Sequence, residues 1–188
     1  MNLVKDLMKY TRCLVFLLSP FLFQLTAHST TVLKLDRNEL TQRANRIIIG
    51  RVQTTQSIWS QDGKSIYTLV QVSVDISIKG ERNSETVLVV VPGGEVGTVG
   101  QIVSGALAFH SGEKVFLFLQ EKTTGIFQIV GLFQGKYDIR QEGNPPVEYV
   151  SRGSSDSLVD PVTKQYIKPE EEKIPLADFI PEIRSYTR

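Results

Sequence analysis

The sequence predicts a mainly β protein, a small antiparallel barrel of the OB-like kind with a short N-terminal helix and a C-terminal arm ending in a short helix. Three observations predict this class. Alternating or β-branched apolar runs recur between residues 47 and 140, and short turns containing glycine separate them. One helical pattern precedes the runs and one follows. Five or more such strands can close into a barrel, which removes the exposed edges of an open sheet.

The first 29 residues predict a secretory signal peptide. Basic residues up to Arg12 precede an apolar stretch over 13–25, and the small residues Ala27 and Ser29 suit cleavage. The stretch is shorter than the roughly 20 residues that a membrane-spanning helix needs. We therefore expect export to the periplasm, the cell envelope or the extracellular space, with no stable membrane span after cleavage. A retained membrane anchor is the alternative.

Composition restricts the partners and the chemistry. The chain carries 21 basic and 20 acidic side chains. It therefore lacks the basic excess that is typical of nucleic-acid binding, and we expect no nucleic-acid partner. The one cysteine, Cys13, lies inside the predicted signal, so the remaining chain can form no disulfide. We divide the chain into a signal peptide over 1–29, an OB-like barrel domain over 30–140 and a polar, proline-rich arm over 141–188.

The first elements after the signal are a helix and a strand. Asp36 lies three residues before Glu39, and this spacing is typical of a capping box, which predicts a helix over 37–45. An apolar run then predicts a strand over 47–57. A tight turn follows at Asp62-Gly63, where glycine tolerates a positive φ.

The next run, over 66–79, alternates between apolar and polar residues, which is the pattern of a strand buried on one face. The run over 86–91 is apolar on both faces and predicts a central strand. Further strands are expected over the ranges 101–109, 115–120, 126–133 and 136–140.

The arm is polar, with at most a brief strand near 148–151. At its end, apolar residues at helical spacing predict a helix that packs on the barrel. Pro175 can open this helix, and Pro181 is expected to break it into two turns. The residues of the predicted apolar face are Leu176, Phe179, Ile180 and Ile183.

Catalytic residue types are few in this sequence. The two histidines are His28, at the predicted cleavage region, and His110, in a turn, so a multi-histidine metal site is not expected. Ser104 or Ser111 beside His110 could form a nucleophile pair, but neighbours in a turn need not face each other. The run 170–172 lacks the ligand spacing of a calcium loop. We predict no enzyme, no cofactor, no catalytic residue and no metal.

The stretch "VPGGEVGTVG" over 91–100 is rich in glycine. It lacks the lysine and hydroxyl residue of a phosphate-binding loop, and a strand rather than a helix follows it. The stretch is therefore a strand-to-strand connection, either a plain turn or a binding loop over 92–98. Trp59 either covers one end of the barrel or contacts a partner. The candidate binding residues are Pro92, Gly93, Gly94, Glu95, Val96, Gly97 and Trp59.

Four segments follow one another in a characteristic order: "RANRIIIGRV", "IYTLVQVSVDISIKG", "VVVPGGEVG" and "SGEKVFLFL". Their order resembles the N-terminal domain of the tissue inhibitors of metalloproteinases, within the netrin-like group of OB-fold barrels. The same pattern is similar, and more closely so, to small exported bacterial proteins without an assigned activity. By position, residues 92–96 match the inhibitors' connector that enters a protease cleft, and Gly97 stands where that family has a cysteine.

These observations favour an exported, non-enzymatic module that binds a protein through the 92–98 loop. The expected partner is an exported or envelope protein, with a protease as one candidate. A carbohydrate-binding barrel is the alternative, because OB folds also bind oligosaccharides, and Trp59 with Tyr67 would be its aromatic platform. Protease inhibition and enzymatic activity rank below both.

Overall fold

The computed structural model describes residues 32–80, 86–103, 105, 107–152, 158–159, 166–167 and 173–188. These residues belong to one compact unit. The predicted signal peptide, Ser104 and the acidic run over 170–172 lie outside the described residues. Among the helices of the described part, none combines the length and apolar character needed to cross a membrane.

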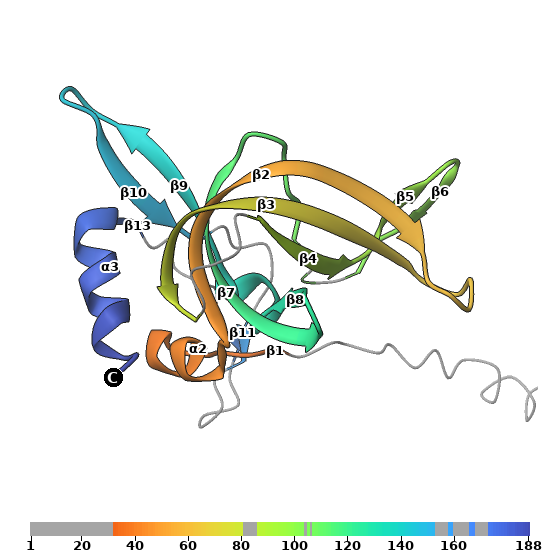
Figure 1. Ribbon diagram of the computed structural model, residues 1–188, viewed down its shortest axis with the longest axis horizontal. Helices are drawn as coiled ribbons and strands as arrows, with labels where there is room; N and C mark the ends of the chain where they lie inside the picture. The colour runs from red at the N-terminus through yellow and green to blue at the C-terminus, as the bar shows by residue number, and fades with distance from the viewer. Residues whose placement is uncertain are drawn as a thin grey trace, which may run out of the picture. The chain divides into compact units, whose positions relative to one another are not determined.

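A closed ring of strands forms the centre of the fold (Figure 1). The hydrogen-bonded order β7-β2-β3-β4-β8 returns to β7 through the pairing of β7 with β8. This ring confirms the predicted mainly β, barrel-like class. One pair, β4 with β8, is parallel, so the ring is not wholly antiparallel. The strands are β2 (Arg46–Trp59), β3 (Ile66–Lys79), β4 (Thr86–Pro92), β7 (Lys114–Thr123) and β8 (Ile126–Ile129).

Apolar side chains that alternate along these strands fill the interior of the ring. Alternation places every second residue of a strand on one face, and here that face is turned inward. β4 lies between β3 and β8, as expected for a central strand. The buried interior consists of Ile48, Val52, Val70, Val72, Val87, Val89, Val91, Phe109, Val115, Leu117, Leu119, Phe127 and Ile129.

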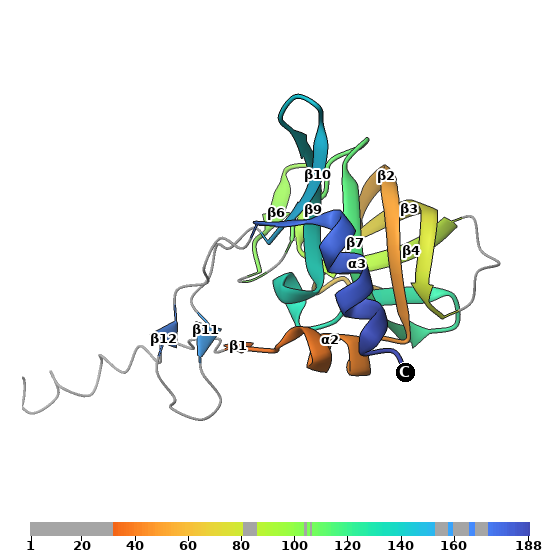
Figure 2. The same ribbon diagram turned by 90° about the vertical axis from the view of Figure 1, so that its left-hand side faces the viewer.

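A second core lies between the sheet and two helices, α2 (Arg37–Arg43) and α3 (Leu176–Ser185). Figure 2 shows α3 in front of the sheet with α2 beside its C-terminal end. Phe179 is fully buried, and its ring centroid lies 4.9 Å from those of both Phe116 and Tyr137. The two helices are joined by an ion pair in which Arg37 Nη1 lies 2.6 Å from Glu182 Oε1.

The capping box predicted at the first helix is confirmed. The amide of Glu39 donates to the Asp36 carboxylate at 2.7 Å, and the amide of Asp36 donates to the Glu39 carboxylate at 2.9 Å. Two amides that the helix leaves without a partner are thereby satisfied.

The apolar face predicted for the C-terminal helix is also confirmed, because Leu176, Phe179 and Ile183 are buried and Ile180 packs against the same core. The expected break at Pro181 is wrong, since α3 continues through it. Buried side chains on both sides of the proline hold the two turns against the sheet.

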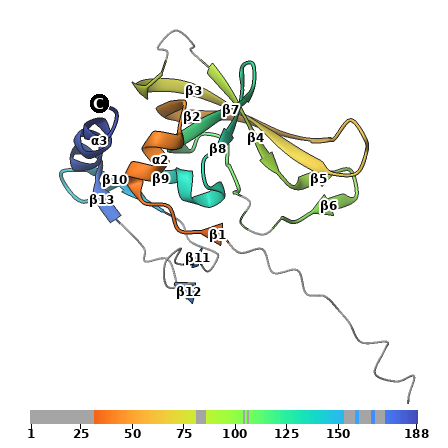
Figure 3. The ribbon, with the colours of Figure 1, turned by 90° about the horizontal axis from the view of Figure 1, so that it is seen from below.

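The arm adds strands to the sheet. β9 (Lys136–Glu142), β10 (Val147–Ser151) and β13 (Lys173–Pro175) continue it beyond β7 in the order β13-β10-β9-β7. The two-residue strands β1 (Val32–Leu33), β11 (Leu158–Val159) and β12 (Tyr166–Ile167) form a separate three-stranded sheet, below the ring in Figure 3.

Three strand predictions need correction. The apolar residues of β3 do not all point into the ring. Register shifts between Ile47 and Gly50 on β2 change the pairing near the end of β3, and Ile76 is 42% exposed. The strand expected over 101–109 is absent from the described residues of that range beyond Gln101. The strand expected over 126–133 ends at Ile129, and a short 3-10 helix, η2 (Leu132–Gly135), follows.

Candidate functional site

The segment predicted as a binding loop is a β-hairpin. β5 (Gly94–Val96) pairs with β6 (Val99–Gln101), so Val96 lies opposite Val99. Gly97 has φ +62°, a left-handed conformation that glycine adopts without a steric penalty. The predicted strand-to-strand connection over 92–98 is thus part of a short hairpin, and the strand pairing orders most of the segment.

Hydrogen bonds fix this hairpin to the end of the β2–β3 hairpin. The Gly93 amide donates to the Ile66 carbonyl at 2.8 Å, and the Thr68 hydroxyl donates to the Gly93 carbonyl at 2.8 Å. The Ile66 amide donates in turn to Oε1 of Gln101 at 2.5 Å. Hydrogen bonds from backbone and side-chain groups thus join the β5–β6 hairpin to the β2–β3 hairpin.

Gly94 lies where the two hairpins approach most closely. A Cβ at this position would lie 2.4 Å from the hydroxyl oxygens of both Ser57 and Thr68, and φ is +132°. The Glu95 amide donates to the Ser57 hydroxyl at 3.3 Å. Only glycine meets both the steric and the conformational requirement here.

Exposed apolar side chains gather on these two hairpins, which lie at the same end of the molecule (Figure 1). Trp59 is 42% exposed at the end of β2, Val99 is 47% exposed on β6, and Ile102 is 99% exposed directly after it. Ile58, beside Trp59, is 37% exposed. We call Trp59, Val99 and Ile102 the distal surface; Ile58 projects from the opposite face of β2 and is not part of it. Trp59 therefore does not close one end of the ring by burial.

Trp59 and Tyr67 do not form one aromatic platform. Directly opposed residues of an antiparallel pair project from the same face of the sheet. Trp59 is opposite Ile66, whereas Tyr67 is opposite Ile58. The two aromatic rings therefore project from opposite faces of the β2–β3 hairpin.

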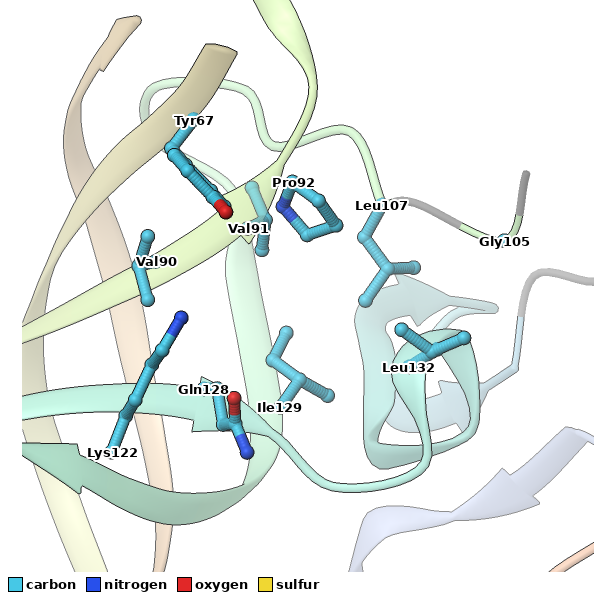
Figure 4. A pocket seen from close by; sticks show the side chains of 10 residues that line it. All are labelled: Tyr67, Val90, Val91, Pro92, Gly105, Leu107, Lys122, Gln128, Ile129 and Leu132. Carbon is cyan, nitrogen blue, oxygen red and sulfur yellow. The ribbon is translucent and has the colours of Figure 1, made fainter. Parts of the chain in front are cut away.

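A pocket of about 170 Å³ lies where the end of β4 meets β8 and the segment after β6 (Figure 4). Its side chains come from β3, β4, β7, β8 and η2, and from the connection that follows β6. Of the predicted site residues, Pro92 lines this pocket, and the others do not. The lining, which we call the side pocket, consists of Tyr67, Val90, Val91, Pro92, Gly105, Leu107, Lys122, Gln128, Ile129 and Leu132.

The wall of the side pocket formed by Leu132 has an unusual backbone. Leu132 has φ +58°, a left-handed conformation that is rare for residues other than glycine. The adjacent Gln134 is fully buried, and its side chain accepts from the Leu35 amide at 2.7 Å and donates to the Leu33 carbonyl at 2.8 Å. These bonds fix the turn that presents Leu132 to the pocket.

A second, charged cavity of about 480 Å³ lies beside the turn that contains His110. Nζ of the buried Lys136 is 2.6 Å from Oε1 of Glu113, and it also pairs with Asp138. Burial alone would raise the pKa of Asp138, but the adjacent Glu113 and Lys136 outweigh it, and the pKa is lowered. Each buried charge in this group therefore has a partner.

The serine and histidine considered as a nucleophile pair are not brought together. The Ser111 hydroxyl donates to the Gln53 carbonyl at 2.8 Å rather than to His110. His110 itself lies at the exposed rim of the charged cavity. In the described part of the chain, no three His, Cys, Asp or Glu side chains are grouped so that they could hold a metal ion.

The sequence marked the glycine-rich segment over 91–100 as a candidate site but did not indicate the side pocket. Glycine spacing marked residues 93–97, because backbone requirements leave a local signal. The pocket is assembled from six segments that are far apart in the chain, and Leu107 and Leu132 look like ordinary strand residues in the sequence. Searches of protein-family models and of curated proteins find no match to this chain.

Proposed function

We propose that this protein is an exported binding module that recognises a protein partner through its distal surface. The observation that carries this proposal is the exposure of three apolar side chains, Trp59, Val99 and Ile102, at two hairpins that hydrogen bonds hold together. Exposed apolar groups concentrated in one region of a soluble protein are typical of interaction sites. Tryptophan is among the side chains that contribute most to binding energy.

The fixed hairpins favour recognition by a preformed surface. A flexible loop loses conformational freedom when it binds, and this loss reduces affinity. The bonds from Ile66 and Thr68 remove most of that freedom before a partner arrives. The glutamate at position 95 adds an exposed negative charge on β5. We therefore expect a partner surface that combines an apolar centre with a basic edge.

Capture of a partner tests the proposal. The full chain would be immobilised and exposed to envelope and secreted fractions of the source organism, and the retained proteins would be compared between variants. We expect a specific protein to be retained by the wild type and lost by the double variant Trp59→Ser, Val99→Ser, which removes two side chains of the distal surface.

Ile76→Ser is the matched control, because Ile76 is equally exposed but lies ten positions from Ile66 along β3. Retention by the wild type and by Ile76→Ser, but not by the hairpin variant, supports the proposal. Equal retention by all three chains would place the binding site elsewhere.

A further inference from the structure

We propose that the side pocket binds a small apolar carboxylate, a ligand with one aromatic ring or one short branched chain attached to a carboxylate group. The source is either a free acid or the last residue of a polypeptide, which share this chemistry. The inference rests on the pocket alone and does not depend on a protein partner at the distal surface.

The charge in the pocket lining favours a negatively charged ligand. Lys122 is the one charged residue in the lining, and no described carboxylate lines the pocket with it. Its ammonium lies 5.4 Å from the centre of the Tyr67 ring and has no ion pair among the described residues. Figure 4 shows this nitrogen directed toward Val90 and Tyr67 at the edge of the pocket. A carboxylate placed here would supply the missing counter-charge.

Two neutral groups lie near the same edge. The Tyr67 hydroxyl has no hydrogen bond with the described residues, and the Gln128 amide donates to Gln120 at a long 3.4 Å. An apolar lining with a few polar groups is the usual construction of a small-molecule site. The ammonium, the hydroxyl and the amide can all donate hydrogen bonds to a carboxylate.

The volume limits the apolar part of the ligand. A protein cavity of about 150 Å³ can hold a benzene molecule, and the side pocket measures about 170 Å³. One ring or one branched chain of four or five carbons therefore fits, whereas a long acyl chain does not. The apolar walls come from both β4 and the turn at Leu132.

The left-handed backbone of Leu132 is a separate observation that indicates a ligand. A leucine in this conformation is strained, and such residues concentrate at ligand sites. The bonds of Gln134 hold the strained turn in place. The pocket wall is thus preformed, which lowers the cost of binding a small ligand.

Ligand-observed NMR titrations of the full chain test this proposal. The probes are phenylacetate, isovalerate and their uncharged amides. We expect both acids to bind roughly threefold to tenfold more tightly than their amides, and we expect added salt to weaken this preference. In Lys122→Met the preference should disappear. In the control Lys64→Met, which removes an exposed lysine from the β2–β3 turn, it should remain.

A second variant tests the location. Val90→Phe places a ring in the pocket, and it should abolish binding of all four probes while the circular dichroism spectrum stays unchanged. Equal affinity for acids and amides would overturn the proposal. Unchanged binding by a folded Val90→Phe protein would also overturn it.

A further titration, with a peptide probe, distinguishes the two sources of the carboxylate. N-acetyl-glycyl-phenylalanine would be compared with its C-terminal amide in the same titrations. If the free-acid peptide binds more tightly than phenylacetate, the terminal residue of a polypeptide is the ligand. If phenylacetate binds more tightly, the ligand is a small acid. Both results support the carboxylate chemistry, provided that Lys122→Met removes the preference.

Discussion

At the scale of single residues, two glycines of the same hairpin have different roles. Gly94 leaves no room for a Cβ between Ser57 and Thr68, whereas nothing lies within 4 Å of a Cβ placed on Gly97. Both have positive φ, so replacing either glycine by alanine destabilises the protein. The difference between the two losses of stability therefore measures the close contact between the two hairpins at Gly94.

We predict that Gly94→Ala lowers the free energy of unfolding by about 3 kcal/mol and Gly97→Ala by about 1 kcal/mol. Denaturant unfolding measures both values. Amide hydrogen exchange should also show loss of protection at Ile66 in Gly94→Ala only. Equal effects of the two substitutions would mean that the hairpins do not depend on this contact.

A second prediction at this scale concerns Gln134. Replacing this buried amide by leucine leaves the Leu35 amide and the Leu33 carbonyl without their partners. The Leu35 amide is buried and would stay unsatisfied, which costs about 1–3 kcal/mol of stability, whereas the carbonyl of the exposed Leu33 can bond to water. Gln53→Leu, which removes an exposed bond to Ser73, should change stability by less than about 0.5 kcal/mol. If chemical denaturation gave the same free energy of unfolding for Gln134→Leu as for the wild type, this role of Gln134 would be contradicted.

Residues that satisfy backbone requirements were the predictable ones. Asp36 with Glu39 and the glycines of 93–97 produce signals within a few positions of the chain. Gln134 produces none, because its hydrogen-bond partners, Leu33 and Leu35, lie about a hundred positions earlier. Long-range polar contacts of this kind cannot be recognised from spacing.

At the scale of elements, α3 is part of the core. The ring of Phe179 packs edge-on against Phe116 and lies against Tyr137. We predict that Phe179→Ala lowers the free energy of unfolding by about 3–5 kcal/mol. Ala177→Ser on the exposed side of the helix should cost about 0.5 kcal/mol. A separate early transition of the helix in thermal unfolding would mean that α3 does not share a core with the sheet.

The ion pairs between the turn before β7 and β9 give a pH dependence. Glu113 and Lys136 lower the pKa of Asp138 in the folded chain, despite burial that raises it. A lowered carboxyl pKa contributes stability above the unfolded value of about 3.9, and this contribution is lost as the pH falls. Asp138→Asn should therefore be less stable than the wild type at pH 6, with a difference that narrows below about pH 4.

Urea unfolding at several pH values measures this difference. Asp75→Asn, at an exposed position of β3, is the control and should follow the wild-type curve. A difference between Asp138→Asn and the wild type that stays constant down to pH 3 would contradict the assigned cause.

The elements themselves were largely predictable where apolar periodicity was strong. The pattern over 66–79 predicted β3. The last residues of this strand do not point into the ring, because register shifts near Gly50 of β2 change the pairing. The hairpin of β5 and β6 was missed, since three-residue strands are too short to show a period. Pairing shifts and short strands depend on neighbours that periodicity does not reveal.

At the scale of the whole molecule, the sheet ring carries the two proposed sites. The distal surface combines side chains of two hairpins, and the side pocket lies where the end of β4 meets β8 and η2. The opposite face of the sheet is covered by α2 and α3. The architecture therefore leaves one end of the scaffold available for recognition.

The affinity of the captured partner for two variants tests the central claim most directly. Trp59→Ser, Val99→Ser removes the two largest contributions of β2 and β6 to the distal surface, whereas Ile76→Ser removes an equally exposed side chain elsewhere. Isothermal titration with the purified partner should show a Kd at least about 30-fold weaker for the double variant and unchanged for Ile76→Ser. An unchanged Kd for a folded double variant would contradict recognition through the distal surface.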